Sequence, residues 1–84
     1  MARKHEKTRA AIFERPTGAN IKWSAIEALF VFLSAHIEDR EGSRIAIDFN
    51  GEATVFHRPH PNPDAKKYTV EKVRAILERH GEAP

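Results

Sequence analysis

The sequence contains no cysteine among its 84 residues, which excludes disulfide bridges and thiolate metal sites. Its longest apolar run, Ala28 to Leu33, is far shorter than the roughly 20 residues that span a bilayer. The opening stretch MARKHEKTRA has no apolar segment like that of a signal peptide. From these absences we expect a soluble, cytoplasmic protein that makes no membrane contact.

Glycine is also scarce, and none of the 4 glycines belongs to a glycine-rich phosphate loop. A chain of 84 residues buries a modest core and leaves no room for a separate cofactor-binding lobe. We therefore expect a small active site, if there is one, and no cofactor.

The formal net charge of +2 is mild, but the charges are unevenly distributed along the chain. Acidic residues dominate only between Glu38 and Glu52, whereas basic residues crowd residues 3–15 and the last third of the chain. RNA could bind to these basic regions, although a solvated surface of mixed charge would give the same composition.

The N-terminal segment is compatible with a helix over Lys4–Glu14, which must end before Pro16 because the residue preceding a proline avoids the helical conformation. It has little apolar surface, so either a short packed helix or a basic arm is consistent with it. A connector rich in helix breakers follows over residues 16–20.

The residues S-A-I-E, starting at Ser24, match a capping box and predict a helix that begins there. Apolar residues at spacings of three and four predict one buried face of this helix. These residues are Trp23, Ile26, Leu29, Phe30 and Leu33. A short strand over residues 35–40 and a turn at Glu41-Gly42 should follow.

Residues 44–57 predict a β-hairpin, because Asn50-Gly51 is the preferred pair for a two-residue turn with positive φ angles. The turn sets the register, and it pairs Phe49 with Glu52, Ile47 with Thr54, Ile45 with Phe56, and Arg44 with His57. The large apolar residues then face the helices. The half-open face carries Arg44, Ala46, Asp48, Ala53, Val55 and His57.

After the hairpin, three prolines at positions 59, 61 and 63 predict a stiff, exposed loop. Thr69 is the expected N-cap of a final helix that closes near His80, with Gly81 as its stop. Its buried stripe should be Val70, Val73, Ile76 and Leu77. The elements follow the order of an optional helix and then α-β-β-β-α, which predicts a two-layer α+β fold with helices on one face of an antiparallel sheet.

His57 and His60 are the histidines with the strongest claim to chemistry, because they flank Arg58 at the end of a strand, opposite Arg44. Imidazole titrates near neutral pH, so it can take a proton from a ribose 2′-hydroxyl or give one to a leaving oxygen. Arginine can hold the scissile phosphate. These groups suffice for a small metal-independent ribonuclease, and the ordinary alternative is a pair of solvent-facing histidines.

A metal site at His57-x-x-His60 is disfavoured, because Arg58-Pro59 breaks the helical geometry that brings paired ligands together. The sequence around this pair also has no cysteine and no carboxylate cluster to complete such a site. We therefore expect no metal.

From about Trp23 to Gly81 the chain combines the helix IEALFVFL, a Gly42-Ser43 step into a strand, a hairpin, a Pro/His segment and the helix VEKVRAILERHG. In this combination it resembles the HicA (YcfA-like) toxins of type II toxin-antitoxin systems. The resemblance implies a fold like that of a double-stranded-RNA-binding domain, an mRNA interferase activity and a HicB-like antitoxin partner. The HicA-like domain would span residues 21–84, with residues 1–20 as the N-terminal helix or arm and its connector.

HicA toxins typically carry a catalytic histidine after the Gly-Ser step, whereas Arg44 stands there in this chain. Because His57 pairs with Arg44 in the predicted register, we expect His57 to be the base, His60 the acid and Arg44 a phosphate ligand. Further RNA contacts are expected from Ser43, Arg58, Lys66 and Lys67. The alternative is a degenerate site in a domain that only binds RNA or, through Ala53 and Val55, a protein partner.

Overall fold

The computed structural model describes residues 3–84. In chain order, its elements are α1 (Arg3–Ile12), α2 (Trp23–Phe32), β1 (His36–Asp39), β2 (Arg44–Phe49), β3 (Glu52–His57) and α3 (Lys67–Arg79). The strands form one antiparallel sheet in the order β1-β2-β3. The predicted α+β class and order of elements are confirmed. None of the helices within residues 3–84 is long and apolar enough to cross a membrane.

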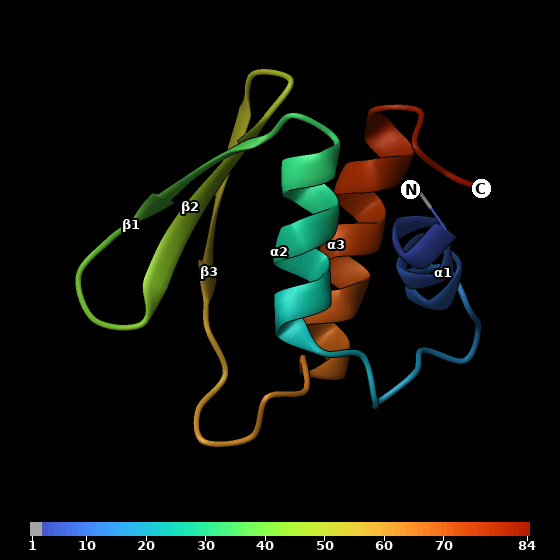
Figure 1. The fold of residues 1–84 in the computed structure, drawn as a ribbon, viewed down its shortest axis with the longest axis horizontal. Helices are drawn as coiled ribbons and strands as arrows, with labels where there is room; N and C mark the ends of the chain where they lie inside the picture. The colour runs from blue at the N-terminus through green and yellow to red at the C-terminus, as the bar shows by residue number, and fades with distance from the viewer. Residues whose placement is uncertain (1–2) are drawn as a thin grey trace.

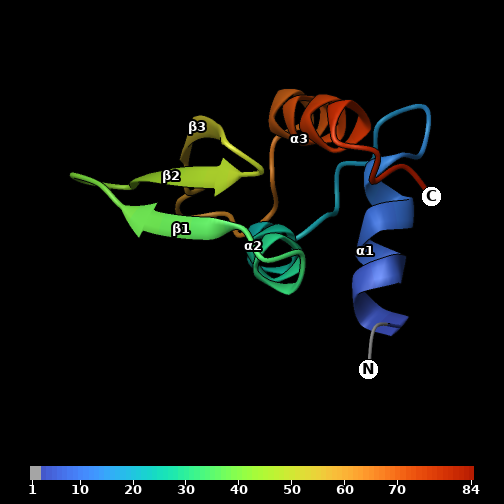
Figure 2. The ribbon, with the colours of Figure 1, turned by 90° about the horizontal axis from the view of Figure 1, so that it is seen from above.

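The helices lie on one face of the sheet, as the sequence predicts. In Figures 1 and 2, α2 and α3 run side by side between the sheet and α1, so α1 forms a further layer behind them. The predicted apolar stripes of α2 and α3 are buried, except that Leu33 is only partly covered. Burial of these side chains from water is the main force that holds the layers together.

The N-terminal segment is a packed helix and not a frayed arm over the residues described. Ile12, at the end of α1, is fully buried in the core. The buried guanidinium of Arg74 on α3 donates hydrogen bonds to the carbonyl oxygens of Ile12 and Glu14, at 2.9 and 3.0 Å, and to Thr17 Oγ1 at 2.9 Å. Arg74 thereby supplies donors to backbone oxygens left free at the end of α1. Residues 1 and 2 of the predicted N-terminal segment lie outside the described residues.

The predicted hairpin register is confirmed at every pair, including Arg44 opposite His57. Asn50 and Gly51 have φ angles of 52° and 88°, as the two-residue turn requires. The residues predicted for the open face are exposed, with the exception of Ala46, which is buried. Ala46 lies on the central strand between Glu38 and Val55, so longer neighbouring side chains cover its small methyl group.

The predicted capping box at Ser24 is wrong, because α2 begins at Trp23 and its N-cap Lys22 makes no side-chain hydrogen bond. The Trp23 amide instead donates to the carbonyl oxygen of Pro63 at 3.0 Å. The Glu27 carboxylate accepts hydrogen bonds from the Trp23 indole and from Arg58. A backbone partner from a distant segment therefore replaces the local cap.

The predicted N-cap at Thr69 is also wrong, because α3 begins at Lys67, after Lys66. The chain just before this helix pairs with the chain before α2: Lys22 and Asp64 form an antiparallel bridge, and the Ala65 amide donates to the Ile21 carbonyl oxygen at 2.7 Å. We call these contacts between residues 21–23 and 63–65 the clamp. The clamp fixes the residues at which α2 and α3 begin.

Candidate functional site

A pocket of about 190 Å³ lies where the chain leaves β3, and we call it the strand-exit pocket. Five residues predicted for the site line it, namely Ser43, His57, Arg58, His60 and Lys66. The start of α3 adds Tyr68 and Thr69, and the start of α2 adds Trp23. The clamp between the segments before α2 and α3 brings these helix starts to the end of the hairpin.

His57 and His60 are both exposed, one at the end of β3 and the other in the proline-rich loop. Both residues line the strand-exit pocket, so the two histidines predicted for the site lie at one pocket. Two imidazole groups are able to act as proton acceptor and proton donor in one reaction. The structure thus brings the predicted acid-base pair to one pocket.

Arg44 does not line the strand-exit pocket, although it is the neighbour of His57 on the open face of the sheet. The Arg58 amide donates to the Ser43 carbonyl oxygen at 2.8 Å, which makes Arg44 and His57 the adjacent, non-hydrogen-bonded pair of the ladder. Side chains of such pairs lie within reach of each other. Arg44 lines a separate hollow of about 250 Å³ with Arg40.

Arg58 points to the opposite face from His57 and is held by two carboxylates. Its Nε donates to Glu27 Oε2 at 2.8 Å, and its Nη1 donates to Asp39 Oδ1 at 2.7 Å. The hydrogen bonds to Glu27, and then those to Asp39, raise the pKa of Arg58 above its usual value. The charge of Arg58 is therefore already neutralised, and this arginine joins β3, α2 and β1.

Lys66 and Lys67 are adjacent and both exposed, but only Lys66 lines the strand-exit pocket. Tyr68 lies beside them with 64 % of its surface exposed. An exposed aromatic ring next to a cation is an arrangement that stacks a base and holds its phosphate.

Sequence reasoning missed Tyr68, Glu27 and Asp39. The sequence around Glu27 predicts a capping box, and nothing local in the sequence relates Asp39 to Arg58. The exposed Tyr68, immediately after Lys66 and Lys67, was the one signal available.

The described residues around the strand-exit pocket do not form a metal site. Over residues 3–84, no group of three or more His, Cys, Asp or Glu side chains could hold a metal ion. General acid-base catalysis by imidazole groups needs no such ion.

A larger cavity, of about 730 Å³, lies between α1 and α2, and none of the predicted site residues lines it. We place the candidate site at the strand-exit pocket, because His57 and His60 line it. No family model, no curated protein and no solved structure matches this chain. The resemblance to HicA toxins thus depends on the motifs and on the order of elements in this chain alone.

Proposed function

We propose that this chain is a HicA-like toxin that binds mRNA at the strand-exit pocket and cleaves it without a metal ion. The observation that carries the proposal is the convergence of His57, His60, Lys66 and Tyr68 on one pocket. The order α2-β1-β2-β3-α3 supports it, because double-stranded-RNA-binding domains and HicA toxins share this order. We propose the same fold type for this chain.

The proposed reaction is a transesterification of the RNA backbone. His57 takes the proton of the 2′-hydroxyl, the 2′-oxygen bonds to phosphorus, and the bond from phosphorus to the 5′-oxygen breaks. His60 gives a proton to that 5′-oxygen. The products are a 2′,3′-cyclic phosphate and a 5′-hydroxyl end. Arg44, the ladder neighbour of His57, binds the phosphate and stabilises the charge that develops on it.

The other residues hold the RNA or the pocket. Lys66 contacts a phosphate, Tyr68 stacks on a base and Ser43 offers a hydroxyl to the backbone. Arg58 is assigned a positioning role, because its contacts with Glu27 and Asp39 fix the start of the loop that carries His60. A HicB-like antitoxin would inhibit by covering this pocket.

A second candidate function is RNA binding without cleavage, by a degenerate HicA-like site. The ion-paired state of Arg58 favours it, because this leaves Arg44 as the one predicted arginine able to stabilise the transition state, and Arg44 lies outside the pocket. The open sheet face with Ala53 and Val55 would then serve a protein partner.

The test is incubation of the purified protein with a long single-stranded RNA in excess EDTA, which silences metal-dependent contaminants. We expect cleavage to cyclic-phosphate ends, and a loss of about 100-fold or more in rate for His57→Ala, the scale of general base catalysis. His36→Ala is the matched control, because His36 is exposed on β1 and does not line the pocket.

Binding is tested on the same RNA by a mobility shift at low salt. Lys66→Ala should weaken binding several-fold more than Lys67→Ala, since only Lys66 lines the pocket. A shift without cleavage would favour the second candidate. Cleavage by His57→Ala at the wild-type rate, or no RNA binding at low salt, would contradict the proposed function.

A further inference from the structure

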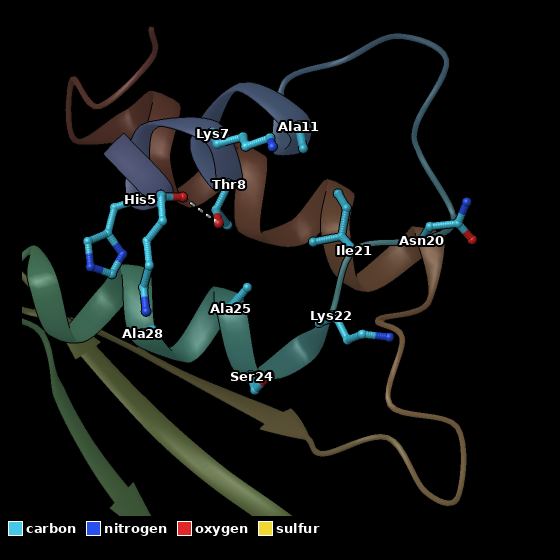
Figure 3. A pocket seen from close by; sticks show the side chains of 11 residues that line it. His5, Lys7, Thr8, Ala11, Asn20, Ile21, Lys22, Ser24, Ala25 and Ala28 are labelled. Carbon is cyan, nitrogen blue, oxygen red and sulfur yellow. Dashed lines mark hydrogen bonds between the residues drawn. The ribbon is translucent and has the colours of Figure 1, made fainter. Parts of the chain in front are cut away.

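The larger cavity is an open groove between two helices and the connector that joins them. Figure 3 shows α1 on one side, with Lys7 and Thr8, and α2 on the other, with Ala25 and Ala28. We call it the α1–α2 groove. Its lining includes Lys4, Lys7, Ala11, Lys22, Ala25 and Ala28. Its volume of about 730 Å³ suits several side chains of a ligand at once.

Positive charge is concentrated in this lining, which contains three lysines and no carboxylate. Over residues 3–84, neither Lys4 nor Lys7 has a carboxylate within ion-pair distance. Lys22 reaches Asp64 only at 3.5 Å. Lys4 and Lys7 are therefore free to pair with an acidic ligand, whereas Lys22 already has a carboxylate partner.

The floor of the groove is apolar and made of small side chains. Ala25 and Ala28 are followed at helical spacing by Phe32, whose surface is 47 % exposed, so one face of α2 continues the apolar surface past the groove. His5 of α1 stacks on Phe32, with ring centroids 4.5 Å apart. Large aliphatic side chains of a ligand would fit above the alanines.

We propose that the α1–α2 groove binds an acidic amphipathic helix of a protein partner. Such a helix would place its apolar residues on the alanine floor and its carboxylates on the lysines, which is the usual way in which helices bind grooves. RNA fits less well, because the aromatic ring in the lining, His5, already stacks on Phe32. The proposal is independent of RNA cleavage at the strand-exit pocket.

The test uses the whole chain, isotope-labelled for amide NMR, and a synthetic helical peptide of about 18 residues, or five turns. The peptide carries leucines on one face and glutamates beside them. We expect shifts concentrated at Ala11, Ala25 and Ala28. A peptide with lysine in place of each glutamate should bind at least about tenfold more weakly, because the lysines of the groove repel it.

Two pairs of variants locate the site on the protein. Ala28→Gln fills the floor, and Lys7→Glu reverses a lysine of the lining; each should weaken peptide binding by about tenfold. Their controls on α1 are Ala10→Gln and Arg3→Glu, because Ala10 and Arg3 are exposed and do not line the groove. The affinity of these two variants for the peptide should stay within about twofold of wild type. The dispersion of the amide spectrum verifies that each variant is folded.

The proposal is overturned if about 1 mM acidic peptide leaves the groove amides unshifted, because an interaction too weak to detect at that concentration would not form a specific complex. It is also overturned if the controls lose as much affinity as Ala28→Gln. A single-stranded RNA oligonucleotide is titrated in parallel. Tighter binding of this RNA than of the peptide at the same groove amides would make the groove an RNA surface and would reject the protein partner.

Discussion

Arg74 and Arg58 both join segments that are distant in the chain, but they do so in different surroundings. Arg74 has 6 % of its surface exposed and donates to two carbonyl oxygens and a hydroxyl. The Arg58 side chain is 40 % exposed and donates to two carboxylates. Arg74 fastens α1 to α3, whereas Arg58 fastens the end of β3 to α2 and β1.

The different surroundings of Arg74 and Arg58 predict different roles for the two arginines. The hydrogen bond from Arg74 to Ile12 is buried and those to Glu14 and Thr17 are partly buried, so loss of Arg74 leaves poorly hydrated oxygens without partners. The carboxylates around Arg58 would regain water if the arginine were removed, because Asp39 is 76 % exposed. We therefore expect Arg74 to matter for the fold and Arg58 to matter for the shape of the strand-exit pocket.

The largest effect is expected for Arg74→Met, which keeps much of the side-chain volume and removes all three hydrogen bonds. The free energy of unfolding should fall by about 3 kcal/mol, as for other losses of partners for buried polar groups. Urea denaturation measures this change. Limited proteolysis should also show faster cleavage in the connector over residues 13–20, because α1 loses its anchor.

Arg74→Lys is the control for the charge alone. A lysine cannot reach all three oxygens at once, so an intermediate loss is expected. If Arg74→Met costs no more than about 1 kcal/mol, the loss expected for the ion-paired Arg58, the distinction between the two arginines fails.

A smaller effect is expected for Arg58→Met, a loss of about 1 kcal/mol in the free energy of unfolding. A double-mutant cycle with Glu27→Gln should assign most of this loss to the pair, because Glu27 is the partner that is better shielded from water, with 21 % of its side chain exposed. The fluorescence of Trp23, whose indole donates to Glu27, reports on the same contact.

Arg40→Met is the matched control, because Arg40 forms an ion pair with Glu38 in which the side chains are 52 % and 57 % exposed. Its effect on stability should be close to zero. A loss for Arg58→Met as large as that for Arg74→Met would mean that the carboxylates around Arg58 hold the fold as strongly as the oxygens around Arg74 do.

The pairing of the hairpin could be predicted residue by residue, because the residues that determine it lie close together in the sequence. Asn50-Gly51 specifies the turn, and the alternation of Ile45, Ile47 and Phe49 specifies the face, so only one register satisfies both. The pairing of Arg44 with His57, and thus the two faces of the candidate site, followed from it.

The helix starts and the ion pairs could not be predicted in this way, because distant segments determine them. Ser24 and Thr69 have the right chemistry for caps, but backbone contacts between residues 21–23 and 63–65 place both starts earlier. Arg58 meets Glu27 and Asp39 across 31 and 19 residues of chain. The α1–α2 groove likewise exists only once α1 has packed.

The smallest effect concerns a third arginine, Arg79, which pairs with Glu52 at the surface beside His80. The hydrogen bond from Arg79, and then that from His80, lowers the pKa of Glu52. A carboxylate with a lowered pKa stabilises the fold fully above its unfolded pKa, about 4.3, and this contribution disappears as the pH falls through its folded pKa. Stability from this group is therefore lost on acidification.

Glu52→Gln should be less stable than wild type at pH 7, by less than Arg58→Met, and the difference should shrink toward pH 3 as Glu52 becomes protonated in the wild type. Urea midpoints measured from about pH 7 to 3 would show the two curves converging. Glu78→Gln is the control, because Glu78 is exposed on the same helix as Arg79 and makes no ion pair within residues 3–84. Parallel curves for Glu52→Gln and wild type would show that the ionised Glu52 carboxylate does not stabilise the fold. The contribution of Arg79 to stability would then be smaller than that of Arg58, and much smaller than that of Arg74.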